Sequence, residues 1–439
     1  MKKASDIFET LRKELHSDKF IESYRLSPKA FVRTRILNFP TIVSFVLNLL
    51  KKSISKELNN FSKQLHIERT SRSSVTHARA KFSSKAFVKL NKTLIEEFYQ
   101  DNDFKTLNDF IVLAIDGSTV QLPNSQILKK TFGYSSNQTE QTMPMARISM
   151  LYDTLNGLTL DARIKPYNAS ERDISIEHLE ALKSLNIDLK KILVIFDRGY
   201  PSYSMIYYLQ ENGIHFLIRS GSKFLKEINE IANAKIKDKI LTVPFKRASK
   251  DAKKEIAKLF PDHLPTHITF RVVVVKLKNG EQEILLTSLI SNKTYPRNIF
   301  YNLYFNRWGI EESYKFYKSG VEIENFSGKS LLSVEQDFHA AVLATNAHAL
   351  LSLEATSEIQ KLETKNIPRK YEYAVNKRVS MEVLKHDFVK VILNPEFDIE
   401  VFCFNIKETM KKDRIPIRPG RCFSRIVKQC RRKFHMNQR

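Results

Sequence analysis

Apolar residues recur with a helical period in the first part of the chain. In the clearest stretch they stand three or four residues apart or side by side, at Ile42, Phe45, Val46, Leu49 and Leu50. This spacing places them on one face of an α-helix. We therefore predict that residues 1–105 are helical.

The pattern then changes to short, continuous apolar runs, which are typical of buried strands. The run IVLAID covers residues 111–116, and two further runs, at 146–153 and 158–164, flank the pair Asn156-Gly157. An Asn-Gly pair between two such runs is a strong signal for a β-hairpin. The sequence thus predicts a first strand followed by a hairpin.

Helices and strands alternate in the next part. The pattern predicts an amphipathic helix over residues 170–185, then the strands ILVIFD at 192–197 and GIHFLIR at 213–219. A hairpin followed by alternating helices and strands fits a mixed α/β sheet. We therefore predict an α/β fold with such a sheet at its centre.

A second β-rich stretch precedes two more predicted helices. The runs at 269–278 and 283–289 flank another Asn-Gly pair and predict a long hairpin. A helix is then predicted from Pro296 to Gly320, because proline favours the first turn of a helix and glycine follows its end. A further amphipathic helix is expected over residues 333–353.

The charge of the chain points to a polyanionic partner. Its 439 residues carry a formal net charge of +24, and the sequence pI is about 9.7. Nucleic acid is the first candidate, because binding to a membrane surface would also need an anchor that we do not find. Cations gather between Arg69 and Lys85, and from Lys411 to Arg439, where eleven Lys and Arg against one Asp give +10.

Neither a signal peptide nor a disulfide framework is expected. The opening segment, MKKASDIFETLRKEL, becomes polar where a signal peptide would become apolar. The cysteines are Cys403, Cys422 and Cys430, an odd number without a CxxC pair, so a zinc site is not expected either. A reducing cytoplasm is the compartment that fits.

One predicted helix carries four side chains with candidate chemistry. Tyr304, Arg307, Glu311 and Lys318 are separated by three, four and seven residues. At about 100° per residue they fall within about 60° of each other on a helix. This stripe can hold a metal ion on its carboxylate and phosphates on its cations.

Two aspartates add to this carboxylate. Asp116 and Asp197 each close a strongly apolar, strand-like run. Alone, each is a common turn former, and Arg198 either contacts a phosphate or pairs with a surface acid. Together with Glu311, however, the two aspartates make the three carboxylates that a two-metal phosphoryl-transfer site needs.

These motifs resemble those of DDE transposases of bacterial insertion sequences, family four, the Tn-five-like cut-and-paste group. The Tyr304–Arg307–Glu311–Lys318 spacing matches the family signature without a gap. The segments IDGSTVQLP and VIFDRGY are similar to the contexts of its first and second catalytic aspartates. The similarity covers about residues 110–350 well and the N-terminal helices loosely.

The resemblance implies a ribonuclease-H-like fold, with a β-rich insertion before the Glu-bearing helix. It also implies that Asp116, Asp197 and Glu311 bind two Mg²⁺ ions, for which Mn²⁺ can substitute. This fits the preference of Mg²⁺ for a few carboxylates together with substrate phosphates. The implied activity is nicking of element ends, followed by transfer of the 3′-hydroxyl into target DNA.

The resemblance further assigns the phosphate backbone of DNA to Tyr304, Arg307 and Lys318. The implied partners are double-stranded DNA, as terminal inverted repeats and target, and a second copy in a homodimeric synaptic complex. The implied place is the bacterial nucleoid. Trp308, the only tryptophan, stands one residue off the stripe, and we expect it in the core.

The pattern and the resemblance together divide the chain into five parts. They are a helical DNA-binding region (1–105), the first part of the catalytic core (106–220), the β-rich insertion (221–299), the last part of the core with the Glu-bearing helix (300–355), and a basic C-terminal region for DNA contact or dimerisation (356–439).

Two alternatives stay open at this point. One is a ribonuclease-H-like nuclease that cleaves DNA without transferring strands. The other is a captured transposase that only binds DNA, although the presence of all three carboxylates argues against it.

Overall fold

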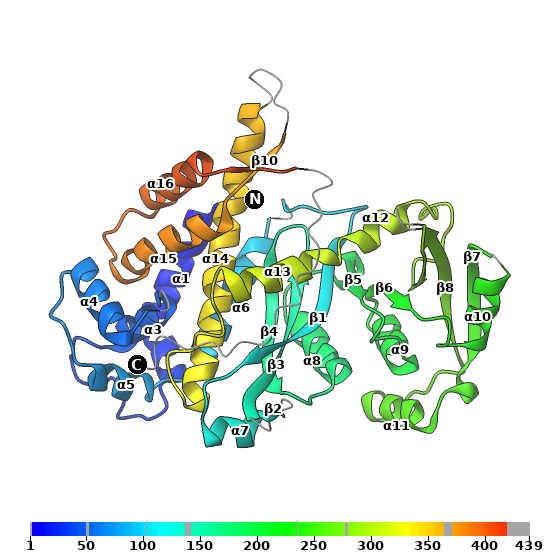
Figure 1. Cartoon of the computed structure of the whole chain (residues 1–439), viewed down its shortest axis with the longest axis horizontal. Coiled ribbons are helices and arrows are strands. Elements are labelled where there is room, and N and C mark those ends of the chain that lie inside the picture. The colour runs from blue at the N-terminus through cyan, green and yellow to red at the C-terminus, as the bar shows by residue number, and fades with distance from the viewer. Residues whose placement is uncertain are drawn as a thin grey trace.

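The computed structural model describes residues 2–49, 52–101, 103–136, 142–234, 236–276, 280–363 and 371–418. Figure 1 shows a helical part on the left, a central sheet with helices around it, and an extension of that sheet on the right. Most of the predicted basic tail, with Cys422 and Cys430, lies outside the described residues. No helix in the described ranges is long and apolar enough to cross a membrane.

The N-terminal part is helical, as predicted. Its helices are α1 (Ala4–His16), α2 (Asp18–Tyr24), α3 (Phe39–Leu47), α4 (Ile54–Leu65), α5 (Arg72–Arg79) and α6 (Lys85–Tyr99). Side-chain caps define several starts, since Asn38 accepts from the N–H of Thr41 at 3.0 Å and Ser71 from that of Ser74 at 3.1 Å. The apolar faces of these helices pack against each other and against the long helix α14 (Leu331–Glu363).

The described strands β1 to β9 form a single mixed sheet. They are β1 (Ile111–Gln121), β2 (Tyr134–Ser136), β3 (Thr142–Asp153), β4 (Leu158–Pro166), β5 (Ile192–Phe196), β6 (His215–Ser220), β7 (Asp238–Pro244), β8 (His267–Lys276) and β9 (Gln282–Thr287). Both predicted hairpins, β3–β4 and β8–β9, are confirmed.

The first five long strands have the ribonuclease-H-like order that the resemblance implied. Their order in the sheet is β4-β3-β1-β5-β6. The strands β1, β5 and β6 are parallel, whereas β3 is antiparallel to both of its neighbours. This arrangement brings the carboxyl ends of β5 and β6 to one edge, where side chains that follow parallel strands gather.

The β-rich insertion extends the same sheet. Its strand β9 pairs with β6 in antiparallel fashion, and β8 and β7 follow outward. Its helices are α10 (Lys226–Asn233) and α11 (Lys250–Leu259). As a result, residues far along the insertion come within reach of the carboxyl end of β6.

The two faces of the sheet are covered by different helices. The helices around the sheet are α7 (Gln126–Phe132), α8 (Glu171–Lys183), α9 (Tyr203–Glu211), α12 (Ile299–Phe305) and α13 (Trp308–Ser319). In β5, Leu193 and Ile195 pack with α12, whereas the alternate residues Val194 and Phe196 join the larger core. This alternation is the period-two pattern of a strand that is buried on both faces.

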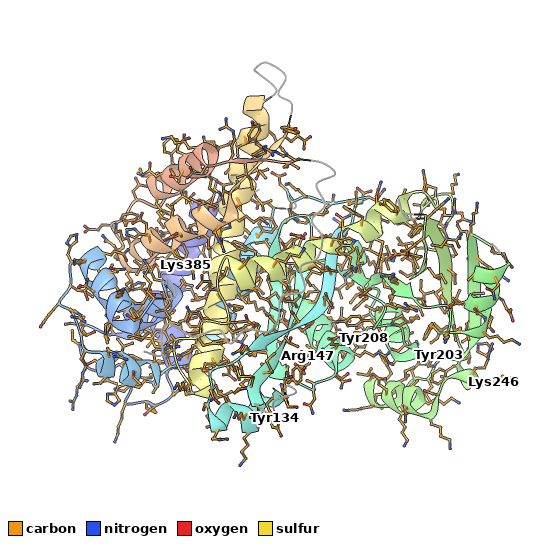
Figure 2. All side chains as sticks on the ribbon, in the orientation of Figure 1. Tyr134, Arg147, Tyr203, Tyr208, Lys246 and Lys385 are labelled. Atoms are coloured by element: carbon orange, nitrogen blue, oxygen red, sulfur yellow. The ribbon has the colours of Figure 1, made fainter. Side chains whose placement is uncertain are left out.

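The C-terminal helices return to the N-terminal part. They are α15 (Lys377–Leu393) and α16 (Ile399–Lys412), and a small pair of strands, β10 (Tyr373–Ala374) and β11 (Ile415–Pro416), joins their ends. Figure 2 shows Lys385 of α15 beside the N-terminal helices, and its ammonium group donates to the carbonyl of Leu49 at 3.0 Å. The helix predicted over 333–353 is longer than expected and forms most of α14.

A buried ion pair joins α5 to α14. The guanidinium of Arg79 contacts Asp337 at 2.9 Å and Gln336 at 3.0 Å, and the side chains of both Arg79 and Asp337 are almost completely buried. We expect Asp337→Ala to lower the free energy of unfolding by about 3–5 kcal/mol, because it leaves a buried cation without its partner. Urea denaturation measures this loss.

The matched control is Asp262→Ala, which removes an exposed carboxylate and should change stability by less than about 0.5 kcal/mol. A loss below about 1 kcal/mol for Asp337→Ala would mean that this ion pair contributes little to holding α5 on the core.

Candidate active site

The strand register brings Asp116 and Asp197 together. The parallel ladder of β1 and β5 ends at the pair Ile115 and Phe196. Asp116 and Asp197 are the residues that directly follow these two in the sequence. Asp197 directly follows its strand, as predicted. The prediction that Asp116 ends a strand is wrong, because the ladder of β1 with β3 continues through Asp116 to Gln121.

Asp116 lies in a low-dielectric and negatively charged surrounding. Burial is the largest cause that raises its pKa, to about 6, and the charges of Asp197 and Glu311 raise it further. The N–H of Gly117, which donates to Oδ1 at 2.8 Å, and the charge of Arg307 act in the opposite direction. All three predicted carboxylates are therefore close enough to interact.

Glu311 reaches the aspartates from α13, which packs on β1. The hydroxyl of Tyr314 donates to the carbonyl of Asp116 at 2.6 Å. Near the start of α13, an added Cβ on Gly309 would stand only 3.3 Å from the Cβ of Thr154. These two close contacts determine the distance between the helix and the sheet, and so the position of Glu311.

The single helix predicted from Pro296 to Gly320 is wrong. The chain instead forms α12 and α13, with a tight turn at Asn306 and Arg307 between them. The N–H groups of these two residues donate to carbonyls three residues back, at 3.3 and 3.0 Å. The side chain of Asn306 also donates to the carbonyl of Asn302 at 2.8 Å, a local contact that competes with helical hydrogen bonds.

Arg307 is the buried cation of the site. It is 4% exposed, and its Nη1 lies 2.8 Å from Oε1 of Glu311. Its guanidinium also stacks over the rings of Tyr304, at 5.8 Å, and Trp308, at 4.9 Å. The Nε of Arg307 is buried and has no hydrogen-bond partner among the described residues.

The other two members of the predicted stripe are Tyr304, which lies beside Asp197, and Lys318, which contacts β1. The hydroxyl of Tyr304 is 3.4 Å from Oδ1 of Asp197, and burial raises the pKa of Tyr304, so it stays a hydrogen-bond donor. The ammonium group of Lys318 donates to Ser118 at 2.8 Å, two residues beyond Asp116 on β1. The structure thus brings the whole stripe to one place in spite of the turn.

Arg198 lies apart from this cluster. Its side chain is exposed, and its Nε would lie 3.1 Å from a Cβ added to Gly221. Instead Arg219, at the end of β6, approaches Asp197 at 3.8 Å and contacts Glu283 of β9 at 3.0 Å. Burial raises the pKa of Glu283, whereas the charge of Arg219 lowers it.

Sequence reasoning missed both Arg219 and Glu283. The sequence did contain a signal for Arg219, because this residue lies at the end of a predicted strand, as Asp197 does. The two strands, β5 and β6, are parallel neighbours, so their carboxyl ends meet at one edge of the sheet. The sequence contained no such signal for Glu283, since only the pairing of β9 with β6 brings this residue to the site.

Trp308 is not in the core, contrary to the prediction. It is the first residue of α13, is 49% exposed, and lies against the Arg307 guanidinium. An exposed aromatic ring beside Arg307 is available to contact a ligand.

The donor set of the site suits a hard divalent cation. Asp116, Asp197 and Glu311 offer only carboxylate oxygens, the ligands that Mg²⁺ and Mn²⁺ prefer. Within the described ranges, no three His, Cys, Asp or Glu side chains are grouped closely enough to hold an ion as they stand. In the described structure one oxygen of Glu311 instead contacts Arg307, a cation of the protein.

The chain matches a known protein family. Residues 108–347, more than half of the chain, match the family described as "Transposase DDE domain". The chain belongs to this family. The match to the DDE domain runs from just before β1 to the middle of α14 and so includes all three carboxylates. DDE transposases generally use divalent metal ions.

Comparison with solved structures found a similar chain. It is the cryo-EM structure of the piggyBac transposase synaptic complex with hairpin DNA, at 9% sequence identity and a TM-score of 0.48. The alignment covers 91% of this chain and 85% of that one. No curated protein matches the sequence.

Proposed function

We propose that this DDE-domain protein is a cut-and-paste DNA transposase of an insertion sequence, similar to family four. The observation that supports the proposal is the meeting of Asp116, Asp197 and Glu311 around the buried guanidinium of Arg307. A carboxylate group with a cation beside it can hold metal ions and accept a DNA phosphate in the same place.

Each residue has a distinct role in this proposal. Asp116, Asp197 and Glu311 are the ligands of two Mg²⁺ ions, or of Mn²⁺ in their place. When bound, the ions supply charge neutralisation and activation of the attacking oxygen. Glu311 has to turn one oxygen away from Arg307 to take part.

The cations then orient the phosphate. The guanidinium of Arg307 donates to a phosphate oxygen, because its planar array of donors suits that geometry. Lys318 contributes charge above β1, and the Tyr304 hydroxyl donates beside Asp197. Arg198 lies further out, so in this proposal it contacts the backbone of a neighbouring nucleotide.

The reaction is the same substitution carried out twice. In nicking, the oxygen of water forms a bond to phosphorus, the bond to the 3′-oxygen breaks, and that oxygen takes a proton. In joining, the 3′-hydroxyl oxygen attacks a target phosphate, loses its proton, and displaces the target 3′-oxygen. The nucleophile comes from water or DNA, so the site needs no nucleophilic side chain.

The remaining parts of the chain have supporting roles in the proposal. Residues 1–105 bind the terminal inverted repeats, and the basic region 356–439 contacts DNA or a second copy. A homodimer brings the two element ends together in a synaptic complex. Because the substrate is chromosomal DNA, we place the protein in the bacterial cytoplasm, at the nucleoid.

A cleavage assay on the ends of the source element tests the proposal. With Mg²⁺, the wild-type protein is expected to leave a 3′-hydroxyl at the element boundary and, with a target plasmid present, to give joined product. Glu311→Gln should bind the same ends and give neither product, because its amide is a poor metal ligand.

The outcomes separate the alternatives. Cleavage without joining would indicate a nuclease that lacks strand transfer. Binding without cleavage in Mg²⁺ or Mn²⁺ would indicate a captured DNA-binding protein, and the proposal would be wrong in either case.

A further inference from the structure

A large groove lies in the N-terminal helical part, formed by a different set of elements from the carboxylate site. It lies between the loop that joins α2 to α3 and the helix α5, and its volume is about 840 Å³. This is within the range of about 300–1,000 Å³ that is usual for sites that bind small molecules or comparable parts of larger ones. The proposed function assigns residues 1–105 to the duplex ends of the element but gives this groove no role of its own.

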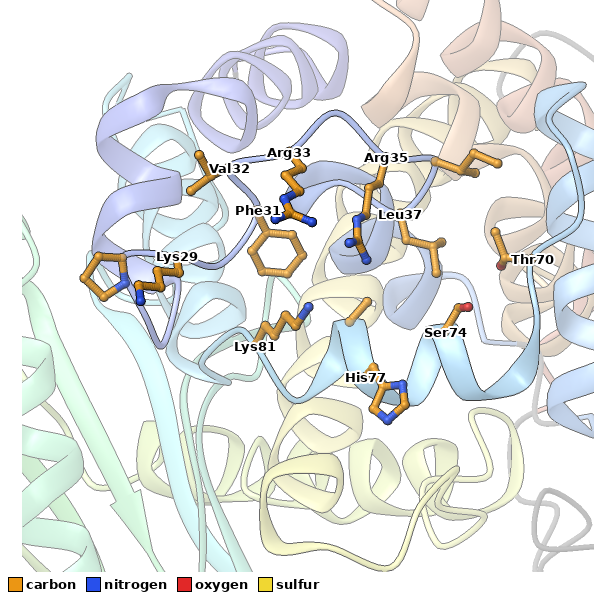
Figure 3. A pocket seen from close by; sticks show the side chains of 13 residues that line it. Lys29, Phe31, Val32, Arg33, Arg35, Leu37, Thr70, Ser74, His77 and Lys81 are labelled. Atoms are coloured by element: carbon orange, nitrogen blue, oxygen red, sulfur yellow. The ribbon is translucent and has the colours of Figure 1, made fainter.

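The groove is positively charged. Figure 3 shows the side chains of Arg33, Arg35 and Lys81 around the ring of Phe31, with Lys29 nearby. All four cations are exposed, and none forms an ion pair with an acidic residue of the described chain. The lining itself contains no Asp or Glu. A net charge of this size without counter-charges favours an anionic ligand.

Part of the groove is lined by apolar side chains, which a site for phosphate alone does not need. Its lining includes Phe31, Val32, Ile36 and Leu37, and Val32 is 66% and Ile36 40% exposed. Exposed apolar side chains grouped in a cavity mark a binding surface more often than singly scattered ones do. The ligand should therefore carry both negative charge and flat or apolar surface.

The shape of the groove is held by the core. Phe31 packs edge-on against Phe39, with ring centroids 5.3 Å apart. The backbone of Phe31 has φ of 60°, a left-handed conformation that bulky residues seldom adopt. On the other wall, α5 is fixed to α14 by the ion pair of Arg79 and Asp337. The cavity is thus already formed without a ligand.

Several occupants do not fit these features. The basic C-terminal residues, with a net charge of +10 from Lys411 to Arg439, would be repelled by the cations of the groove. An intact duplex presents phosphates, but its bases are stacked inside and would leave the apolar lining in water. A strand with unstacked bases offers phosphates and exposed base faces together.

We propose that this groove binds an unstacked, single-stranded segment of DNA. Arg33, Arg35 and Lys81 contact its phosphates, and a base lies against Phe31 and the apolar lining. The inference deepens the proposed function, because a transposase that opens DNA at element ends would expose such a strand. The groove is then a second contact for the DNA, apart from the carboxylate site.

Binding of a labelled oligonucleotide by the full chain tests this inference. The probes are a thymidine strand of about 12 nucleotides, a length typical for single-strand sites, and a duplex of the same length. The buffer contains EDTA, so the result does not depend on cleavage. If the protein never cleaves DNA, the groove can still be tested, and the two proposals can fail separately.

The expected result is a selective loss. Arg33→Ala with Arg35→Ala should weaken single-strand binding about tenfold and lower the salt slope by about 0.7 for each cation removed. Phe31→Leu should weaken it by a similar factor without changing the salt slope, because it removes a stacking surface and no charge. Duplex binding should change less in both variants.

The matched control removes two cations elsewhere. Lys254→Ala with Lys258→Ala alters α11 on another part of the molecule (Figure 1), and both lysines are exposed. This variant should bind the single strand like wild type. Circular dichroism of each variant checks that the fold is kept, which the exposure of Arg33 and Arg35 favours.

Three results would overturn the inference. One is a groove variant that binds the single strand as tightly as wild type. The second is an equal loss for strand and duplex, which would make the groove a contact for the duplex backbone. The third is competition by poly-glutamate as strong as by DNA of equal charge, which would indicate an acidic peptide as the ligand.

Discussion

Replacing Asp116 with asparagine is expected to abolish DNA cleavage and, at the same time, to stabilise the metal-free protein. The loss of activity should be at least about a thousandfold, because the variant loses a carboxylate that would share the metal ions. The gain in stability has a separate cause. Burial raises the pKa of Asp116 to about 6, so the folded protein disfavours the charged form.

The direction of the pH dependence follows from that raised pKa. The unfolded chain has the ordinary value of 3.8, so the folded state holds the proton more tightly. The stability that Asp116 contributes is fully present below about pH 4 and is lost as the pH rises through about 6. The Asp116→Asn variant has no such loss, so its free energy of unfolding should exceed that of wild type by about 2–3 kcal/mol near pH 8.

Thermal unfolding in EDTA measures this effect. The midpoint of Asp116→Asn should exceed that of wild type at pH 8, and the difference should vanish near pH 4. Added Mg²⁺ should raise the midpoint of wild type more than that of the variant. An inactive variant that is less stable than wild type at pH 8 would instead point to a structural role for Asp116, and our assignment would be wrong.

Removing the charge of Arg307 should have the next largest effect. Arg307→Met is expected to lower the single-turnover rate of cleavage by about 10²–10³, the usual cost of losing one preorganised donor to a phosphate. Arg307→Lys should lose about tenfold, because an ammonium group keeps the charge but not the planar pair of donors.

A pH profile distinguishes this role from simple support of the fold. The charge of Arg307 lowers the pKa of Asp116, so its loss should raise that pKa and move the onset of metal activation to higher pH. Arg307→Lys, which keeps the positive charge, should have a pH profile close to that of wild type. Lys254→Met, on exposed α11, is the control and should leave rate and profile unchanged. A slow Arg307→Met enzyme with an unshifted profile would contradict our interpretation.

Local patterns predicted most of the elements correctly. The period of the apolar positions depends only on neighbours in the chain, and it predicted the N-terminal helices and the buried strands β1, β5 and β6. The Asn-Gly pairs predicted both hairpins, because the turn geometry is a property of those two residues. The spacing of the stripe from Tyr304 to Lys318 identified residues that do come together.

Predictions that depended on a helix continuing unchanged were less accurate. The turn at Asn306 and Arg307 interrupts the predicted helix, and it leaves Trp308 exposed. A weak local preference, here the side chain of Asn306, competes with helical hydrogen bonds, and the outcome depends on how α13 docks on β1. The sequence alone does not contain that contact.

The sequence by itself predicted the candidate site, with its three carboxylates and the cations beside them, and the transposase family to which the chain belongs. Only the tertiary structure decided how they meet. The register of β1 and β5 brings Asp116 to Asp197, and the pairing of β9 with β6 adds Glu283. Both results depend on contacts between distant segments, which no local pattern encodes, and the groove around Phe31 depends on the same kind of contact.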